Sequence, residues 1–197
     1  MILAAGCAHP DVGSGTSPIA VDPVVRVSVV PAAPAVRAGG GVALMLRGEG
    51  GGGVIALPSG IEATIEPGGG GLRVRFSTEE VTAASSVTIA AADSGAPVRL
   101  NGRDYRGSAM VSTGGSGVMA VNVVGVEQYL LGVVGAEMGR RGEPDLGALR
   151  AQAVVSRSVA VKRIGQWRIR GYDLLATVAD QAYAGIGFES PLATQAV

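Results

Sequence analysis

Clusters of glycine divide the first half of the sequence into apolar runs that are too short to form helices. The chain has 197 residues, and 32 of them are glycine. Between residues 25 and 112, runs such as VVRVSVV, VIAL, LRVRF and SSVTIAA alternate with glycine-rich stretches. Their β-branched residues and the period-2 alternation of LRVRF, with Arg73 and Arg75 on one face, indicate strands. This half is therefore predicted to consist of short strands and glycine-rich turns. The glycine clusters do not predict a phosphate-binding loop, because GxxxxGK[ST] is missing and no helix signal follows them.

The pattern becomes helical from Glu127 onward, after two more strands in YRGSAMVSTGGSGVMAVNVV. A short helix begins at Glu127, and we expect Gly132 and Gly135 to limit its length. Glu143-Pro144-Asp145 is typical of a helix start, with Glu143 and Asp145 as capping residues. The next helix is predicted from about Leu146 to Gln166. Its buried face should hold Leu146, Leu149, Ala153, Ala160 and Ile164. The expected fold class is α+β, with a short-stranded, β-rich N-terminal part packed against a helical segment that carries the site.

A single cysteine and a single histidine limit the chemistry. Cys7 and His9 both lie in the first ten residues. No intramolecular disulfide can form. The body of the chain offers no histidine to activate a nucleophile and no Cys or His ligands for a zinc site. We therefore expect no metal and no cofactor, so that catalysis would use carboxylates, hydroxyls, Lys, Arg or backbone groups. The formal net charge of zero argues against binding to nucleic acid.

Residues 1–24 carry a signal of their own. The segment LAAGC, which ends at Cys7, resembles the cleavage box of bacterial lipoproteins, in which the cysteine becomes the lipidated first residue. The residues that follow are rich in Pro, Gly, Ser and Asp and are typical of a linker. One interpretation is a lipoprotein-signal remnant with a lipid anchor at Cys7. The other is an Ala-rich tail with a chance cysteine, and the sequence leaves both open.

Four segments of residues 25–197 resemble a known family. In order they are YRGSAMV, VNVVGVEQYLLGVVGAEM, ALRAQAVVSRSVA and YDLLATVADQAYAG. They are similar to the stage II sporulation protein D and LytB amidase-enhancer family. The resemblance implies one domain over residues 25–197, with about residues 45–112 as a β-rich inserted subdomain. The family's domain usually continues with a Ser/Gly-rich segment, so the resemblance also implies that its C-terminal end is missing after ATQAV.

The resemblance implies an extracytoplasmic, cell-envelope protein that acts on peptidoglycan. The sporulation protein is similar to a lytic transglycosylase that cleaves glycan strands lacking stem peptides. The expected partners are glycan strands and an N-acetylmuramoyl-L-alanine amidase. Two alternatives stay open: a non-catalytic module that binds peptidoglycan or activates the amidase, and an inactive, truncated remnant.

The family motifs also imply site residues. Glu137 matches the catalytic glutamate, and Gln152 and Arg157 match the AQAxxxR helix. Gln181 and Tyr183 match a QxY motif. The resemblance thus implies that Glu137 is the catalytic residue and that substrate is bound by Arg157, Gln152, Gln181 and Tyr183. Two departures are visible: Arg157-Ser158-Val159 replaces Arg-Thr-Tyr, and Val178-Ala179-Asp180 stands where many members have the His and Cys of a metal site.

The residue types leave structural roles open for several of these positions. A carboxylic acid keeps its proton near neutral pH in an apolar pocket, so Leu130, Leu131, Val133, Val134 and Met138 are predicted to form a wall around Glu137. The alternative for Glu137 is an exposed residue at a helix end. Arg157 could pair with an internal carboxylate such as Glu137, and Tyr183 could be a buried, hydrogen-bonded residue. Glu127 is expected at the N-terminus of a helix, where the helix dipole favours it.

Overall fold

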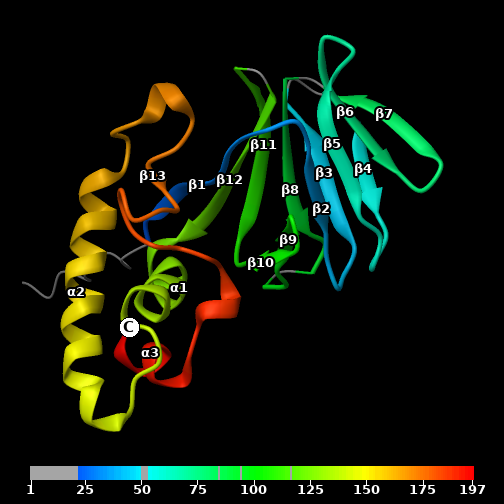
Figure 1. The fold of residues 1–197 in the computed structure, drawn as a ribbon. Coiled ribbons are helices and arrows are strands. Elements are labelled where there is room, and N and C mark those ends of the chain that lie inside the picture. The colour runs from blue at the N-terminus through cyan, green and yellow to red at the C-terminus, as the bar shows by residue number, and fades with distance from the viewer. Residues whose placement is uncertain (1–21, 50–52, 84, 94, 116) are drawn as a thin grey trace, which may run out of the picture.

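The computed structural model describes residues 22–49, 53–83, 85–93, 95–115 and 117–197. Two sheets form one part of the molecule, and the helices lie together beside one end of them (Figure 1). The predicted α+β fold class is confirmed. Cys7 and most of the predicted linker lie outside the described residues. None of the described helices is long and apolar enough to cross a membrane.

The larger sheet brings the first strand of the chain next to strands from its second half. Its spatial order is β13 (Leu174–Leu175), β1 (Val24–Ala33), β12 (Gly117–Gly125), β11 (Ser108–Gly114), β8 (Ser86–Ala91), β3 (Leu44–Gly48) and β4 (Val54–Leu57). Neighbours are antiparallel except β1 and β13, which run parallel. Because β12 leads directly into the first helix, this sheet fixes where the helical part begins.

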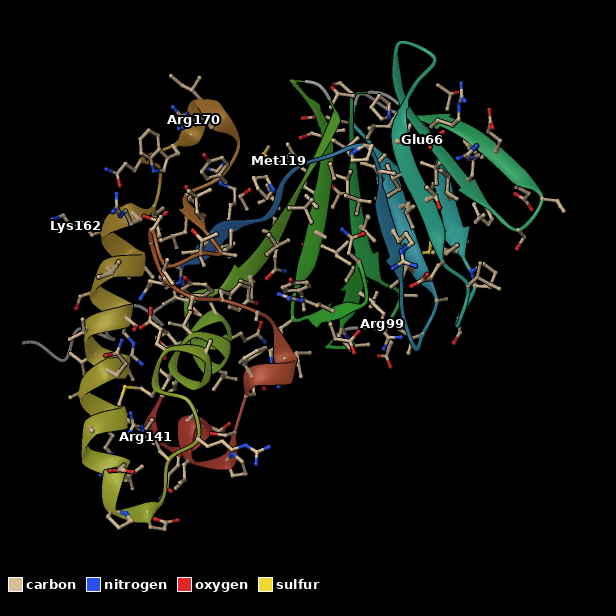
Figure 2. The ribbon with its side chains drawn as sticks, in the orientation of Figure 1. Glu66, Arg99, Met119, Arg141, Lys162 and Arg170 are labelled. Atoms are coloured by element: carbon tan, nitrogen blue, oxygen red, sulfur yellow. The ribbon has the colours of Figure 1, made fainter. Side chains whose placement is uncertain are left out.

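The smaller sheet is antiparallel and contains the predicted LRVRF strand. Its order is β10 (Arg103–Tyr105), β9 (Val98–Leu100), β2 (Val36–Gly39), β5 (Ala63–Gly68), β6 (Gly71–Phe76) and β7 (Glu79–Ala83). Gly69 and Gly70 join β5 to β6 with φ angles of 64° and 81°, which glycine adopts without steric cost. Arg73 and Arg75 lie on the outer face, near Glu66, which is labelled in Figure 2. The predicted alternation is confirmed.

The two sheets share one core. Buried side chains from both sheets and from the first helix form one hydrophobic cluster, which includes Val27, Leu46, Ile65, Val111 and Leu130. The strands between residues 45 and 112 belong to both sheets, and β3, β8 and β11 continue the sheet that β1 and β12 begin. The predicted boundary of an inserted subdomain stays a prediction.

Helical segments follow β12 along the chain. They are α1 (Val126–Met138), η1 (Glu143–Asp145), α2 (Leu146–Arg163), η2 (Arg168–Arg170), η3 (Ile186–Phe188) and α3 (Pro191–Ala196). On α2, Leu149, Ala153 and Ala160 are buried as predicted, together with Ser156. Ile164 is exposed, so its assignment to the buried face is wrong, because the helix ends one residue before it. The Asp145 carboxylate accepts a hydrogen bond from the Gly142 N–H and so caps η1.

The glycines of α1 do not end the helix, which corrects the expectation from the sequence. Gly132 and Gly135 are both buried within α1, which continues to Met138. A Cβ atom on Gly132 would lie 2.9 Å from Cε2 of Tyr183, and one on Gly135 would lie 1.8 Å from the carbonyl oxygen of Phe188. The two glycines therefore allow the C-terminal segment to cross α1 in direct backbone contact.

Replacing Gly135 with alanine should destabilise the protein by about 2 kcal/mol, because the methyl group has no room beside the Phe188 backbone. The matched control is Gly147→Ala on α2, where a Cβ atom would meet nothing within 4 Å. That variant should be stabilised by about 0.5–1 kcal/mol, since alanine favours the helix. Denaturant unfolding of both variants measures the difference. Equal effects would contradict the close crossing.

Candidate functional site

Glu137 and Gln152, two of the residues singled out in the sequence, lie in contact between α1 and α2. Glu137 lies in the last turn of α1, and its Oε2 accepts a hydrogen bond from Nε2 of Gln152. The same Nε2 donates to Oγ of Ser156 at 3.2 Å. Gln152 and Ser156 are four residues apart, and this spacing places them on one face of α2. Glu137 and Gln152 are 15 residues apart in the sequence, and the packing of α1 against α2 brings the carboxylate and the amide into contact.

The predicted apolar wall around Glu137 is wrong. Glu137 is exposed, whereas Leu130, Val133 and Val134 are completely buried. Met138 packs against a small cluster that α1 shares with α2 and α3. Successive residues of an α-helix point about 100° apart, so the face that buries this apolar run turns Glu137 toward solvent. Its carboxyl group is therefore accessible to a ligand from outside.

Arg157 pairs with Glu127 and not with Glu137. Its Nε and Nη2 donate to Oε1 and Oε2 of Glu127, each at 2.6 Å, and Nη2 also donates to the carbonyl oxygen of Val197 at 3.1 Å. These hydrogen bonds lower the pKa of Glu127, although partial burial acts in the opposite direction. Glu127 does lie in the first turn of α1, as expected. Arg157 thus ties α1, α2 and the C-terminal segment together, and its role in binding substrate stays a prediction.

Gln181 and Tyr183 lie in the interior, and each is 4% exposed. The Tyr129 hydroxyl donates to Oε1 of Gln181 at 3.3 Å, and Nε2 of Gln181 donates to the Ser156 carbonyl at 3.4 Å. The ring of Tyr183 packs against that of Tyr129, with the centroids 4.7 Å apart. Burial raises the pKa of both tyrosines, which therefore remain neutral donors. Tyr183 is thus buried and hydrogen-bonded, the alternative that the sequence left open for it, and both side chains hold the C-terminal segment against α1 and α2. A role of Gln181 and Tyr183 in binding substrate stays a prediction.

Asn122 is a residue of this network that the sequence interpretation missed. It is completely buried on β12 and accepts a hydrogen bond from the Tyr183 hydroxyl at 2.9 Å. Its Nδ2 donates to the carbonyl oxygens of Arg106 and Ser108 at 2.8 and 2.9 Å. A lone amide inside the apolar run VMAVNVV was the available signal, because a buried polar side chain requires partners.

An ion pair also holds the C-terminal segment to the sheets. Nε and Nη2 of Arg106 donate to the two carboxylate oxygens of Glu189, both at 2.7 Å. The Glu189 side chain is 13% exposed, and the pair joins the turn after β10 to the residue that follows η3. The paired carboxylate makes a fork-to-fork contact, which is the strongest geometry for an arginine ion pair.

Basic residues at the end of α2 and in η2 face solvent. Lys162 on α2 and Arg170 on η2 are labelled in Figure 2, and both are exposed. The Arg170 guanidinium lies 4.7 Å from the ring centroid of Trp167, so this cation covers one face of the indole. Asp180, which directly precedes Gln181 of the QxY motif, accepts a hydrogen bond from the Leu175 N–H and pairs with Arg163 at 3.2 Å. Within the described residues, no three His, Cys, Asp or Glu side chains gather as metal ligands.

Comparison with known proteins relates part of the chain to a family. Residues 114–197 match the model of the family described as Stage II sporulation protein, SpoIID. The matched range starts at the end of β11 and contains β12, α1, α2 and the C-terminal segment, and thus all the predicted site residues. No curated protein and no solved structure matches the chain.

Proposed function

We propose that the protein cleaves the glycan strands of peptidoglycan as a lytic transglycosylase does. The match of residues 114–197 to the SpoIID model, which suggests a role in sporulation or at the cell wall, supports this proposal. The proposal assigns Glu137 as the single general acid and base. It places the protein outside the cytoplasm, where the substrate lies, with a lipid anchor at Cys7 as a further part of the proposal. An N-acetylmuramoyl-L-alanine amidase is the proposed protein partner.

One carboxyl group is enough for the proposed reaction. The Glu137 acid donates its proton to the glycosidic oxygen, and the bond from that oxygen to C1 breaks. The carboxylate then accepts the proton of the sugar's own 6-hydroxyl while that oxygen bonds to C1 and closes a 1,6-anhydro ring. Glu137 ends protonated, as it began, and no water is consumed.

The observation that carries this proposal is the contact between Glu137 and Gln152. The Gln152 amide holds one carboxylate oxygen of an exposed glutamate, so the other oxygen can face a ligand. A glycan strand lying over the last turn of α1 would exclude water from the carboxyl group, and desolvation favours the protonated form that the first step needs. Gln152 acts here as a positioning residue.

A second candidate function is a non-catalytic module that binds peptidoglycan or activates an amidase. Two observations favour it. Glu137 is exposed, and Arg157 is occupied by Glu127 and by the Val197 carbonyl. A binding module does not need a carboxyl group that is shielded from water. Catalysis does, and because Glu137 is exposed, the bound substrate itself would have to provide that shielding.

A digest of peptidoglycan glycan from which the stem peptides have been removed decides between the two candidates. We expect the full chain to produce 1,6-anhydro ends, which mass spectrometry detects. A parallel assay with a purified amidase and intact peptidoglycan measures activation. Amidase stimulation without any anhydro product would contradict the enzyme and support the binding module.

A further inference from the structure

A hollow with a volume of about 690 Å³ lies between the end of α1, η3 and α3. Gly135 and Ala136 line it from α1, and Arg140 and Arg141 line it from the loop that follows. Phe188 and Ser190 are among the residues on the opposite side. The volume lies within the range of about 300–1,000 Å³ that is usual for small-ligand sites. Figure 2 labels Arg141 on this loop, next to α3.

The charge of the hollow is positive. Arg140 and Arg141 are both exposed, and among the described residues no carboxylate forms an ion pair with either of them. Nε of Arg141 donates to the Met138 carbonyl at 2.8 Å, which holds the side chain near the end of α1 and leaves its Nη groups free to donate. Glu189 is the acidic residue in the lining, and its carboxylate is occupied by Arg106. The two arginines in the lining therefore favour an anionic ligand, above all a carboxylate.

The hollow also has an apolar side that suits a sugar ring. Phe188 is 50% exposed although it is a large aromatic residue, and Pro191 and Leu192 lie beside it in the lining. An aromatic face next to cationic donors matches a ligand that is apolar on one side and charged at one substituent. The Ser190 hydroxyl adds a small polar group to the same wall.

The position of the hollow connects it to Glu137. Its lining includes Gly135 and Ala136 directly before Glu137 in the chain and Gly139 and Arg140 shortly after it. Glu137 itself is held from the α2 side by Gln152. The hollow is therefore built from the residues that flank Glu137 in the chain, at the same end of α1.

We propose that this hollow binds a carboxylate-bearing sugar unit, with its carboxylate at Arg140 and Arg141 and its ring against Phe188. In the context of the proposed function, on which this part rests, the unit is a muramic acid residue whose lactyl carboxylate is free of peptide. A uronic acid residue of another envelope polymer has the same chemistry. The hollow would then distinguish acidic glycans from neutral ones.

Calorimetric titration of the full chain with three saccharides tests the proposal. The probes are a peptide-free tetrasaccharide of alternating N-acetylglucosamine and N-acetylmuramic acid, a tetragalacturonate, and neutral chitotetraose. The titrations use the Glu137→Gln variant, so that the ligand is not cleaved. We expect at least one acidic probe to bind about tenfold more tightly than chitotetraose, as charge-assisted hydrogen bonds would give.

Variants of the loop locate the binding. Arg140→Ala should remove most of the preference for the acidic probe, and Arg140→Lys should restore part of it. Arg47→Ala is the matched control, because it removes one exposed arginine on β3, in the other part of the molecule. Equal binding of acidic and neutral probes, no binding of any probe, or an equal loss in the Arg47 variant would each overturn the proposal.

The outcomes also separate this proposal from the proposed function. If the muramic acid probe binds at Arg140 and the digest gives no anhydro ends, the subsite stands and the enzyme does not. If only tetragalacturonate binds at Arg140, the hollow recognises acidic sugars of another polymer, and its link to peptidoglycan is wrong.

Discussion

Glu137→Gln should reduce the formation of 1,6-anhydro ends about a hundredfold to ten-thousandfold, the range that general acid–base groups contribute. Glutamine keeps the size of the side chain and can still contact Gln152, but it can neither donate an acidic proton to the leaving oxygen nor accept the proton of the 6-hydroxyl. Mass spectrometry of single-turnover digests of peptide-free glycan measures the loss. Because Glu137 is exposed, the free energy of unfolding should change by less than about 0.5 kcal/mol.

The matched control is Glu143→Gln in η1, which removes another exposed carboxylate from the same end of the helical part. It should leave the formation of anhydro ends within about twofold of the wild-type rate, since the proposed mechanism does not involve it. Equal activity of the Glu137 variant and the wild type would remove Glu137 from the mechanism and leave the binding module as the better function.

Asp173→Ala should destabilise the fold by about 3 kcal/mol, the lower end of the cost of breaking a buried ion pair, because the Arg26 side chain is 31% exposed. Asp173 is 1% exposed and receives hydrogen bonds from the N–H, Nε and Nη2 of Arg26 and from the N–H of Gly165. These bonds connect β1, the turn after α2 and the segment that leads to β13, so they hold the helical part on the sheet. Asp93→Ala, at an exposed aspartate, should change the free energy of unfolding by less than about 0.5 kcal/mol.

The contribution of Asp173 to the free energy of unfolding should decrease at low pH. Burial acts to raise the pKa of Asp173, but the hydrogen bonds from Arg26 and Gly165 outweigh it and hold the pKa below its usual value. The stabilisation is therefore complete above the unfolded-state pKa of about 3.9 and is lost as the pH falls through the lower pKa of the folded state. Denaturant unfolding from about pH 7 down to about pH 2 should show the gap between wild type and variant narrowing below about pH 4. A constant gap would mean that the ionised form adds no stability.

The local features of the fold were accessible from the sequence. The strands of the first half, the Gly69-Gly70 turn and the helix after Pro144 depend on period, turn chemistry and helix-start residues, which act over a few positions. The prediction that Gly132 and Gly135 limit the length of α1 was wrong for a physical reason. Glycine weakens an isolated helix, but here the absence of side chains is what allows the C-terminal segment to cross α1.

The site was predictable only in part. The motifs selected Glu137 and Gln152, which do meet, and Arg157, which lies on the same helix as Gln152. The partner of Arg157 could not be chosen, because Glu127 and Glu137 both lie on α1, and the register of α2 against α1 decides which one it reaches. The exposure of Glu137 likewise depends on which face of α1 meets the sheets.

The sequence by itself determined the α+β class, the order of strands and helices, the residue types available for chemistry and the motifs through which residues 114–197 match the SpoIID model. Those properties depend on neighbours in the chain or on short motifs. Only the tertiary structure decided that Arg157 binds Glu127, that Gln181 and Tyr183 are buried, and that Arg140 and Phe188 line one hollow. These contacts join segments 25 or more residues apart, and they follow from how whole elements pack, which no local pattern encodes.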